Sequence, residues 1–165
     1  MKVQIAALMN DSIVDGPGLR YAIYVQGCPH RCKGCHNPQT HPFDGGTEMD
    51  TEDIWNEIEE NPLLSGITLS GGDPLCQPKP MAEIAKKAKE SGLSVWCYTG
   101  YFFEDLIKDQ DDDIMALLRY TDVLVDAPFV LEERTLELPF RGSKNQRLVD
   151  VPRSLEDGKV KEILL

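Results

Sequence analysis

The chain has 165 residues, of which 41% are hydrophobic and 27% charged, a composition typical of a folded globular protein. This length predicts a single domain over residues 1–165, without room for a second domain of comparable size. The net charge of −11 argues against nucleic acid and anionic membranes as main partners, because an acidic chain repels phosphate groups. No apolar stretch is long enough to span a bilayer or to serve as a signal peptide, so we expect a cytoplasmic protein.

Four short runs rich in branched and aromatic residues predict β-strands. In chain order they cover residues 19–25, 66–70, 93–98 and 123–126. Their nearly continuous apolar character is typical of strands that are buried on both faces of a parallel sheet.

Helical segments are predicted between these strands. Apolar residues recur at helical spacing in three places: Ile54, Trp55 and Ile58; Met81, Ile84, Ala85 and Ala88; and Ile114, Leu117 and Leu118. Asp50 is placed to cap the first helix, and Gly92 is placed to end the second. The acidic run at residues 109–113 predicts a solvated turn that caps the third.

The alternation of strands and helices predicts an α/β fold built from βαβ units. The chain is too short for a closed eight-stranded barrel, so we expect an open, partial (βα) barrel with a mainly parallel sheet. Polar or glycine-containing turns follow the four predicted strands, at residues 27–29, 71–74, 99–100 and 126–128. In such sheets ligands bind at the carboxyl ends of the strands, so these turns predict one site at one rim.

Three cysteines after the first predicted strand form the pattern C-x3-C-x2-C: Cys28, Cys32 and Cys35. Closely spaced cysteines in a reducing cytosol indicate metal binding or catalysis rather than disulfides. A loop this short must bring its three thiolates together. Iron–sulfur clusters that only transfer electrons usually have four cysteine ligands, whereas three leave one iron open to a small molecule. The motif therefore predicts a 4Fe-4S cluster with an open iron.

The alternative is a structural zinc site in a binding module without catalysis. Zinc needs four ligands, and His30, His36 or His41 could supply the fourth. Zinc sites usually pair C-x2-C with a second, distant cysteine pair, which this sequence lacks, so the cluster is favoured. Cys76 follows the Gly-Gly turn and lies near the site or is a spare thiol, while Cys97 is expected to be a small buried hydrophobe.

The cysteine loop resembles the signature of the radical S-adenosylmethionine (SAM) enzymes. Within that superfamily the chain is similar, from about residue 9 to residue 150, to the activating proteins of anaerobic ribonucleoside-triphosphate reductases. The similar segments are DGPGLR (15–20), GCPHRCKGCHNP (27–38), SGGDPL (70–75), WCYTGY (96–101), DVLVD (122–126) and FRGSKNQR (140–147). The last segment and the short length favour this branch.

This resemblance implies a radical SAM fold and a glycyl-radical activase. A reduced 4Fe-4S cluster binds SAM through its open iron and passes one electron to the sulfonium. SAM then breaks into methionine and a 5′-deoxyadenosyl radical, which takes a hydrogen atom from a glycine of the reductase. The implied partners are the reductase large subunit and a flavodoxin- or ferredoxin-type electron donor, and the protein supplies placement and exclusion of water.

The resemblance also implies roles for particular residues. Cys28, Cys32 and Cys35 are the implied cluster ligands. Gly34, beside Cys35, stands where many radical SAM enzymes have an aromatic residue next to the adenine, so a ring contact would have to come from His36.

The remaining implied contacts to SAM lie after the other predicted strands. Gly71, Gly72 and Asp73 match the Gly-Gly-Glu motif that meets the amino group of SAM, with a carboxylate one methylene shorter. Glycines suit this role because they let the backbone approach closely. Ser70, Thr99 and Asp126 are the further candidates for cofactor binding.

Ordinary structural roles also remain open for these residues. Gly-Gly-Asp-Pro alone is usually a turn, Thr99 could simply leave a strand, and Asp126 could cap a local loop. Arg141, Asn145 and Gln146 could be surface polar residues. The activases of other glycyl-radical enzymes, such as pyruvate formate-lyase, share the cluster loop but are usually longer, and the deazaguanine synthases are similarly compact.

Overall fold

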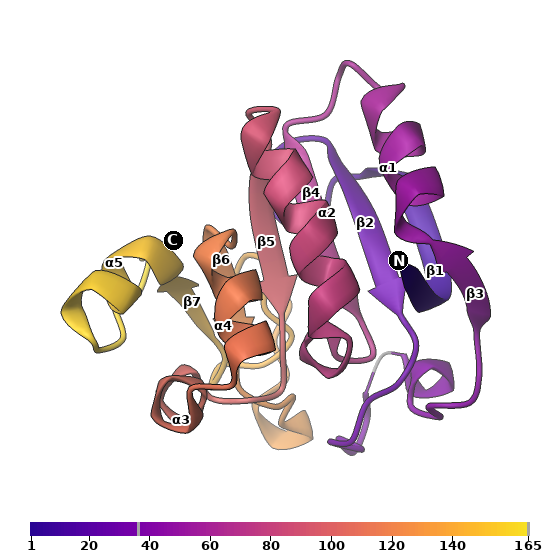
Figure 1. The fold of residues 1–165 in the computed structure, drawn as a ribbon. Coiled ribbons are helices and arrows are strands. Elements are labelled where there is room, and N and C mark those ends of the chain that lie inside the picture. The colour runs from indigo at the N-terminus through magenta and orange to yellow at the C-terminus, as the bar shows by residue number, and fades with distance from the viewer. Residues whose placement is uncertain (36, 165) are drawn as a thin grey trace.

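A seven-stranded sheet is the framework of the computed structural model, which describes residues 1–35 and 37–164 (Figure 1). The strands are β1 Lys2–Ser12, β2 Arg20–Val25, β3 Thr47–Asp50, β4 Gly66–Gly71, β5 Ser94–Tyr98, β6 Val123–Asp126 and β7 Arg147–Asp150. They lie in the order β3-β1-β2-β4-β5-β6-β7, with β2, β4, β5 and β6 parallel and the outer strands antiparallel. The edges β3 and β7 do not pair with each other, so the sheet is open.

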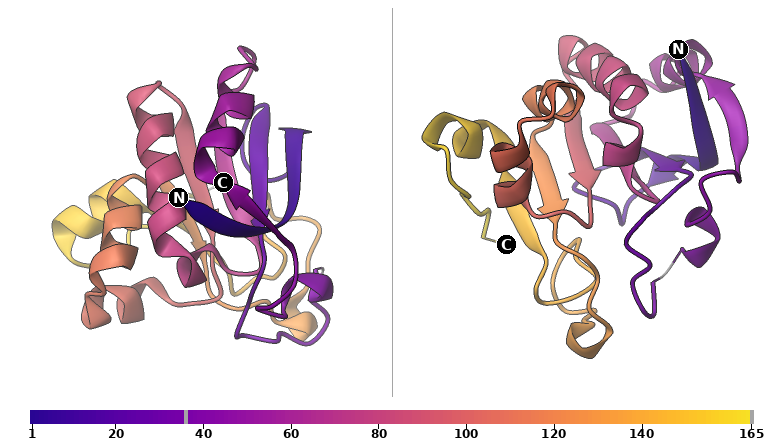
Figure 2. Two further views of the ribbon diagram at one scale, coloured as in Figure 1. Left: turned by 45° about the vertical axis from the view of Figure 1, so that its right-hand side comes forward. Right: turned by 60° about the horizontal axis from the view of Figure 1, so that its bottom comes forward.

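The helices cover one face of this sheet, and mainly loops lie on the other (Figures 1 and 2). They are α1 Thr51–Glu59, α2 Pro78–Glu90, α3 Phe103–Asp109, α4 Asp112–Arg119 and α5 Val151–Asp157. Short 3-10 turns occur at η1 Pro38–Thr40, η2 Pro74–Cys76 and η3 Leu131–Glu133. Within the described part of the chain, no helix is both long and apolar enough to cross a membrane.

The open α/β sheet with a parallel centre is confirmed. The four predicted strands correspond to β2, β4, β5 and β6, and the three predicted helices to α1, α2 and α4. The prediction missed β1, β3 and β7, which form the antiparallel edges, and also α3 and α5. These three outer strands are only partly buried, so their sequences lack the continuous apolar character of the central ones.

The predicted helix ends are confirmed at the level of single hydrogen bonds. The Asp50 carboxylate accepts the N–H of Glu52 and caps α1, while Asp111, within the acidic run, caps α4. Gly92 has φ +83°, and the chain leaves α2 there. The N–H of Leu93 then bonds back to a carbonyl of the last helical turn.

Alternation along the central strands separates a core face from a polar face. Tyr21, Ile23 and Val25 of β2 are fully buried in the main core under the helices, as are Val95 and Cys97 of β5. Cys97 is therefore the small buried hydrophobe that was predicted. Because side chains alternate along a strand, the intervening residues must point to the helix-free face.

The helix-free face carries hydroxyl and aromatic side chains beside a smaller buried cluster that includes Trp96, Val123, Val125 and Leu148. Tyr24 and Thr68 both hydrogen-bond Asp15 on this side, through the carboxylate and the backbone carbonyl respectively. Ser70 and Tyr98 line a cavity on the same side. This face is therefore suited to binding, while the opposite face provides the apolar burial that stabilises the domain.

Arg20 is a fully buried cation that ties the chain before β2 to the sheet. Its Nε donates to Thr68 Oγ1 at 2.8 Å, and its Nη1 donates to Pro17 O at 3.0 Å and Ser94 Oγ at 2.9 Å. Its Nη2 donates to the carbonyls of Ile67 at 2.7 Å and Ser94 at 3.1 Å. Burial lowers the pKa of Arg20 to about 10, so the guanidinium stays charged at neutral pH.

We expect Arg20→Met to lower the free energy of unfolding by roughly 2–4 kcal/mol, because it leaves buried carbonyls without donors. Urea unfolding of the purified chain measures this loss. Arg119→Met, at an exposed position in the last turn of α4, is the matched control and should change stability by less than about 0.5 kcal/mol. Equal unfolding midpoints for the two variants would contradict the role given to Arg20.

Candidate functional site

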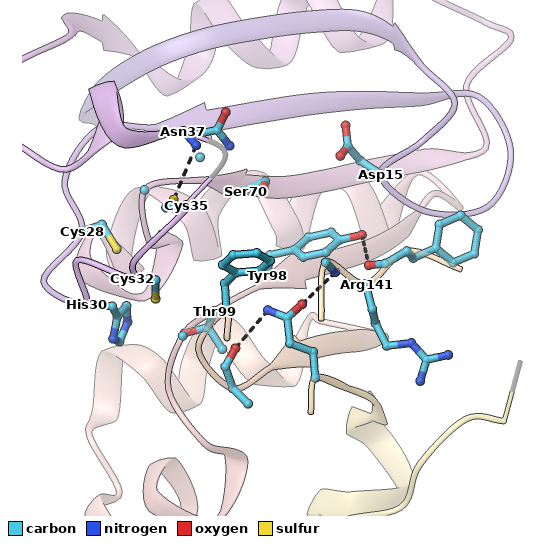
Figure 3. A pocket seen from close by; sticks show the side chains of 18 of the residues that line it. Asp15, Cys28, His30, Cys32, Cys35, Asn37, Ser70, Tyr98, Thr99 and Arg141 are labelled. Carbon is cyan, nitrogen blue, oxygen red and sulfur yellow. Dashed lines mark hydrogen bonds between the residues drawn. The ribbon is translucent and has the colours of Figure 1, made fainter. Parts of the chain in front are cut away.

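A cavity of about 550 Å³ opens on the helix-free face, at the carboxyl ends of the parallel strands (Figure 3). Its lining includes these predicted site residues: Cys28, Cys32, Cys35, Ser70, Gly71, Gly72 and Thr99. Gly34, Asp73 and Asp126 do not line it, and His36 lies outside the described residues. The four turns predicted to share one rim do meet, as the strand topology requires.

The cysteine loop is anchored where it leaves β2. The N–H of Gly27 donates to Thr40 O at 2.6 Å, and the N–H of Cys28 donates to His41 O at 3.1 Å. A turn follows in which the N–H of Cys35 donates to Cys32 O at 3.1 Å. These bonds close the loop at both ends and direct the three cysteines toward the same cavity.

Gly34 has a steric reason to be glycine. Its φ is +76°, and a Cβ there would lie 2.7 Å from Leu131 Cδ1. A side chain at this position would have to displace Leu131 of η3, and the positive φ favours glycine as well. The role of Gly34 in binding adenine through its backbone stays a prediction.

The surroundings of Cys28 and Cys32 fit a positively charged occupant. Burial is the main cause that raises the pKa of the Cys28 thiol, and the Asp73 carboxylate raises it further. Burial likewise raises the pKa of Cys32. Without a cation both thiols would stay protonated at neutral pH, whereas coordination to a metal deprotonates a thiol. The N–H of Asn37 lies 3.4 Å from Cys35 Sγ, a donor of the kind that tunes iron–sulfur clusters (Figure 3).

Two further observations bear on the group that the cavity would hold. His41 lines the cavity, and its Nε2 is out of contact with solvent and has no hydrogen-bond partner among the described residues. Within residues 1–35 and 37–164, no three His, Cys, Asp or Glu side chains gather closely enough to hold one metal ion.

The two glycines of the second loop allow it to lie directly against the cysteine loop. The N–H of Gly72 donates to Val25 O, and the N–H of Asp73 donates to Gly27 O, each at 2.8 Å. Gly71 has φ +96°, and a Cβ on it would collide with the Val25 backbone nitrogen. A Cβ on Gly72 would collide with the Gly27 carbonyl. Only glycine permits this approach.

The side chain of Asp73 points into the interior and does not line the cavity. It is fully buried, and its carboxylate accepts the N–H groups of Leu75 and Gly100, each at 3.0 Å, and the Thr99 hydroxyl at 2.9 Å. His30 Nε2 lies 2.6 Å from its Oδ2. The predicted contact between Asp73 and the SAM amino group stays a prediction, and the structure gives this carboxylate other partners.

Asp126 is also buried and bonded within the protein. It accepts the N–H of Phe103 at 2.9 Å, where α3 begins, and both Nε and Nη2 of Arg147, at 3.0 and 2.6 Å. Arg147 also bonds Glu104, and this hydrogen bond is the main cause that lowers the pKa of Glu104 to about 2. Asp126 therefore fixes the end of β6, while its neighbour Ala127 lines the cavity.

Asp15 and Arg141 lie at the end of the cavity away from the cysteines (Figure 3). The Asp15 carboxylate accepts the Tyr24 hydroxyl at 2.6 Å and the Ser12 hydroxyl at 2.7 Å. In the sequence, Asp15 stands out only as part of the segment DGPGLR, and Arg141 is compatible with an ordinary surface residue. Their place could not be predicted, because neither follows a central strand.

Two other lining residues were missed and are held by bonds to the backbone. The Tyr98 hydroxyl donates to Phe140 O at 2.8 Å. Gln146 accepts the N–H of Gly142 at 2.8 Å and donates to Ala127 O at 3.1 Å. These bonds fold the 127–146 segment over the cavity. The position of Tyr98 on the polar face of β5 was a signal in the sequence, since its neighbour Cys97 was predicted to face the core.

Gly72→Ala should displace the Gly27 carbonyl, and with it Cys28, because the added Cβ has no space. We expect the chain to lose most of its capacity to take up iron and sulfide on anaerobic reconstitution. Gly92→Ala is the matched control: its φ is +83°, so the backbone is strained, but no atom lies within 4 Å of the added Cβ. Iron and sulfide analysis should show normal loading for Gly92→Ala, and normal loading for Gly72→Ala would contradict the proposed contact.

The sequence matches known proteins over most of its length. The profile of a family described as "4Fe-4S single cluster domain" matches residues 14–149, which include all three cysteines of the loop. The chain therefore belongs to the class of proteins built on a single 4Fe-4S cluster domain.

Similar curated proteins show which family within this class the chain belongs to. Proteins named anaerobic ribonucleoside-triphosphate reductase-activating protein are 34% identical in Haemophilus influenzae, 36% in Escherichia coli K12 and 35% in Enterobacteria phage T4. The matches cover 81%, 81% and 82% of this chain and 89%, 90% and 86% of those proteins. The chain belongs to the family of anaerobic ribonucleoside-triphosphate reductase-activating proteins. The crystal structure of QueE from Escherichia coli is a more partial likeness, with a TM-score of 0.48 and 18% identity over 61% of this chain and 53% of that one.

Proposed function

We propose that the chain is a radical SAM activase that generates a glycyl radical on the large subunit of an anaerobic ribonucleoside-triphosphate reductase. The observation that carries this proposal is the convergence of Cys28, Cys32 and Cys35 on a cavity whose other walls include the exits of β4 and β5. The family supports the target, since the relatives are named as activating proteins of that reductase. A pyruvate formate-lyase type of activase is the alternative among enzymes.

The three cysteines would hold the cluster and leave its fourth iron free toward the rest of the cavity. Bound together, the reduced cluster and SAM supply the one-electron chemistry that removes a hydrogen atom from the target glycine. Gly71 and Gly72 present backbone without side chains to the cavity and so would let SAM approach closely. Ser70 offers a hydroxyl there, and Thr99 supports the wall through its bond to Asp73.

The far end of the cavity supports a protein substrate. Val14 and Leu136 line the cavity and yet are 69% and 95% exposed. Apolar side chains this exposed beside a site favour contact with another macromolecule. A glycine-bearing loop of the reductase would enter over these residues, and its docking would shield the cavity from water.

The electron would come from a flavodoxin- or ferredoxin-type protein, which the resemblance to radical SAM enzymes supports. A cytoplasmic location suits an oxygen-sensitive cluster and cysteines that must stay reduced. We also propose one domain for residues 1–165, since all seven strands belong to one sheet.

Replacing Cys32 with alanine should abolish the formation of 5′-deoxyadenosine from SAM, because the cluster loses one of three ligands. Cys97→Ala is the matched control, since Cys97 is a fully buried cysteine on the opposite face of the sheet. Product is measured by chromatography after anaerobic reconstitution and reduction. A Cys32→Ala chain that forms product at the normal rate would overturn the ligand assignment.

The target is tested by incubating the reconstituted chain with SAM, a reductant and either the anaerobic reductase or pyruvate formate-lyase. We expect a glycyl-radical EPR signal only with the reductase. A signal only with pyruvate formate-lyase would favour the alternative activase. A colourless protein that binds zinc under anaerobic purification, in place of a brown one that bleaches in air, would instead favour the binding module.

A further inference from the structure

His30 links the cysteine loop to the Gly-Gly-Asp loop. It lies between Cys28 and Cys32, and its Nε2 is 2.6 Å from Oδ2 of Asp73, 43 positions later in the chain. The His30 side chain is 16% exposed and that of Asp73 is fully buried. Sequence reasoning considered His30 only as a zinc ligand. Its observed partner is a carboxylate in another loop, so the contact joins two motifs that both belong to the site.

The remaining surroundings of His30 fix its ring. A Cβ on Gly100 would lie 2.5 Å from His30 Cδ2, so the ring packs directly on this glycine. The Tyr101 ring meets it edge to face, with centroids 4.6 Å apart and planes at 75°. The cysteine loop is thus held by the exits of both β4 and β5. This packing gives Gly100 a steric reason to be glycine.

The donors around Asp73 determine the direction of the contact. Asp73 Oδ2 already accepts the N–H of Gly100, and Oδ1 accepts that of Leu75. An ionised carboxylate has no hydrogen to donate, so its contact with His30 uses the form of the ring in which Nε2 carries the proton and donates. A buried carboxylate needs several such donors to offset its lost hydration. Each loop that supplies a donor is therefore bound to the same carboxylate.

The short side chain of Asp73 suits this arrangement. Asp73 is the N-cap of η2, and its carboxylate accepts the N–H of Leu75, two residues on, with Pro74 between them. Aspartate makes this local turn because its carboxylate lies close to its own backbone. The carboxylate of a glutamate, one methylene longer, would be too far along the side chain to accept from the Leu75 N–H and from His30 at the same time. The departure from Gly-Gly-Glu thus has a structural explanation within this chain.

The contact bears on the sulfur of Cys28 through the backbone. His30 and Arg31 are two of the three residues between Cys28 and Cys32, so the path of the chain through them sets where both sulfurs lie. Arg31 has φ +49°, a conformation that a residue with a side chain keeps only when its surroundings hold it. A fixed His30 ring therefore helps to hold the backbone that places Cys28 and Cys32, together with any hydrogen bonds that this backbone gives to their sulfurs. Hydrogen bonds to the sulfurs are among the factors that set the potential of an iron–sulfur cluster.

We propose that His30 and Asp73 form a positioning pair, in which Asp73 acts on the cluster loop through His30 and does not itself bind the amino group of SAM. The inference rests on the cluster site proposed above. It changes the role of Asp73 from a direct contact with the cofactor to a support of the ligands. His30 becomes a determinant of cluster retention and of cluster potential, although it coordinates no iron.

The test compares His30→Ala, His30→Gln, Asp73→Asn and Asp73→Glu with the wild-type chain after anaerobic reconstitution. Iron retention, the midpoint potential from EPR-monitored titration and SAM binding by equilibrium dialysis are measured. His30→Ala should shift the potential and weaken cluster retention on the order of ten-fold or more, as loss of groups that orient metal ligands does. His30→Gln, whose amide nitrogen can still donate to Asp73, should restore much of both.

The Asp73 variants separate the two roles of the carboxylate. Asp73→Asn should shift the potential in the same direction as His30→Ala, and the double variant should lose no more than either single one, because the two residues act as a unit. Asp73→Glu should be as impaired as Asp73→Asn. Asp111→Ala, which removes the cap of α4 far from the cavity, is the structural control and should leave the potential unchanged.

Three results would overturn the inference. One is a His30→Ala chain with wild-type retention and potential. Another is an Asp73→Glu chain that binds SAM and keeps the wild-type potential, since that is expected of a direct ligand. The third is a ten-fold loss of SAM binding in Asp73→Asn with none in His30→Ala. A wild-type chain that takes up no cluster would overturn the proposed function and this inference together. Any of the three results above, obtained with a wild-type chain that does take up the cluster, would overturn this inference alone.

Discussion

The close contact between the loops that leave β2 and β4 is the constraint on which the site depends. Gly72 lies so near the Gly27 carbonyl that no Cβ fits between them, and paired backbone hydrogen bonds join the two loops at their start. This contact fixes where Cys28 begins the cluster loop and turns Asp73 into the interior. A buried carboxylate then requires donors on every side, and the exits of β4 and β5 and the cysteine loop supply them.

The central sheet could be predicted because β2, β4, β5 and β6 are buried on both faces and therefore carry continuous apolar residues. The outer antiparallel strands could not, since β1 alternates buried and exposed positions irregularly and β7 buries only its two middle residues. Their stability comes from pairing with distant segments, which local patterns do not reveal. The start of α3 was missed for the same reason, as its first N–H bonds the side chain of Asp126.

The sequence predicts where the site lies, but it does not predict how the acidic side chains of the site are oriented. Cysteines and glycines that follow parallel strands must meet at one rim, so their convergence follows from topology. Asp73 and Asp126 also lie at strand ends, but their partners are His30 and Arg147, 43 and 21 positions away. No local pattern pairs residues over such separations. The carboxylates that resemble cofactor ligands are therefore bonded within the protein, which only the three-dimensional arrangement reveals.

The open sheet has a consequence for the order of events during turnover. Because β3 and β7 do not close into a barrel, the chain alone leaves one side of the cavity facing solvent at Val14 and Leu136. Under the proposed function, the missing wall is the surface of the reductase itself. A dry cavity then exists only while the target glycine is in place, so the geometry makes radical formation conditional on docking. An incomplete barrel would thereby protect the activase from its own reactive chemistry when no substrate is bound.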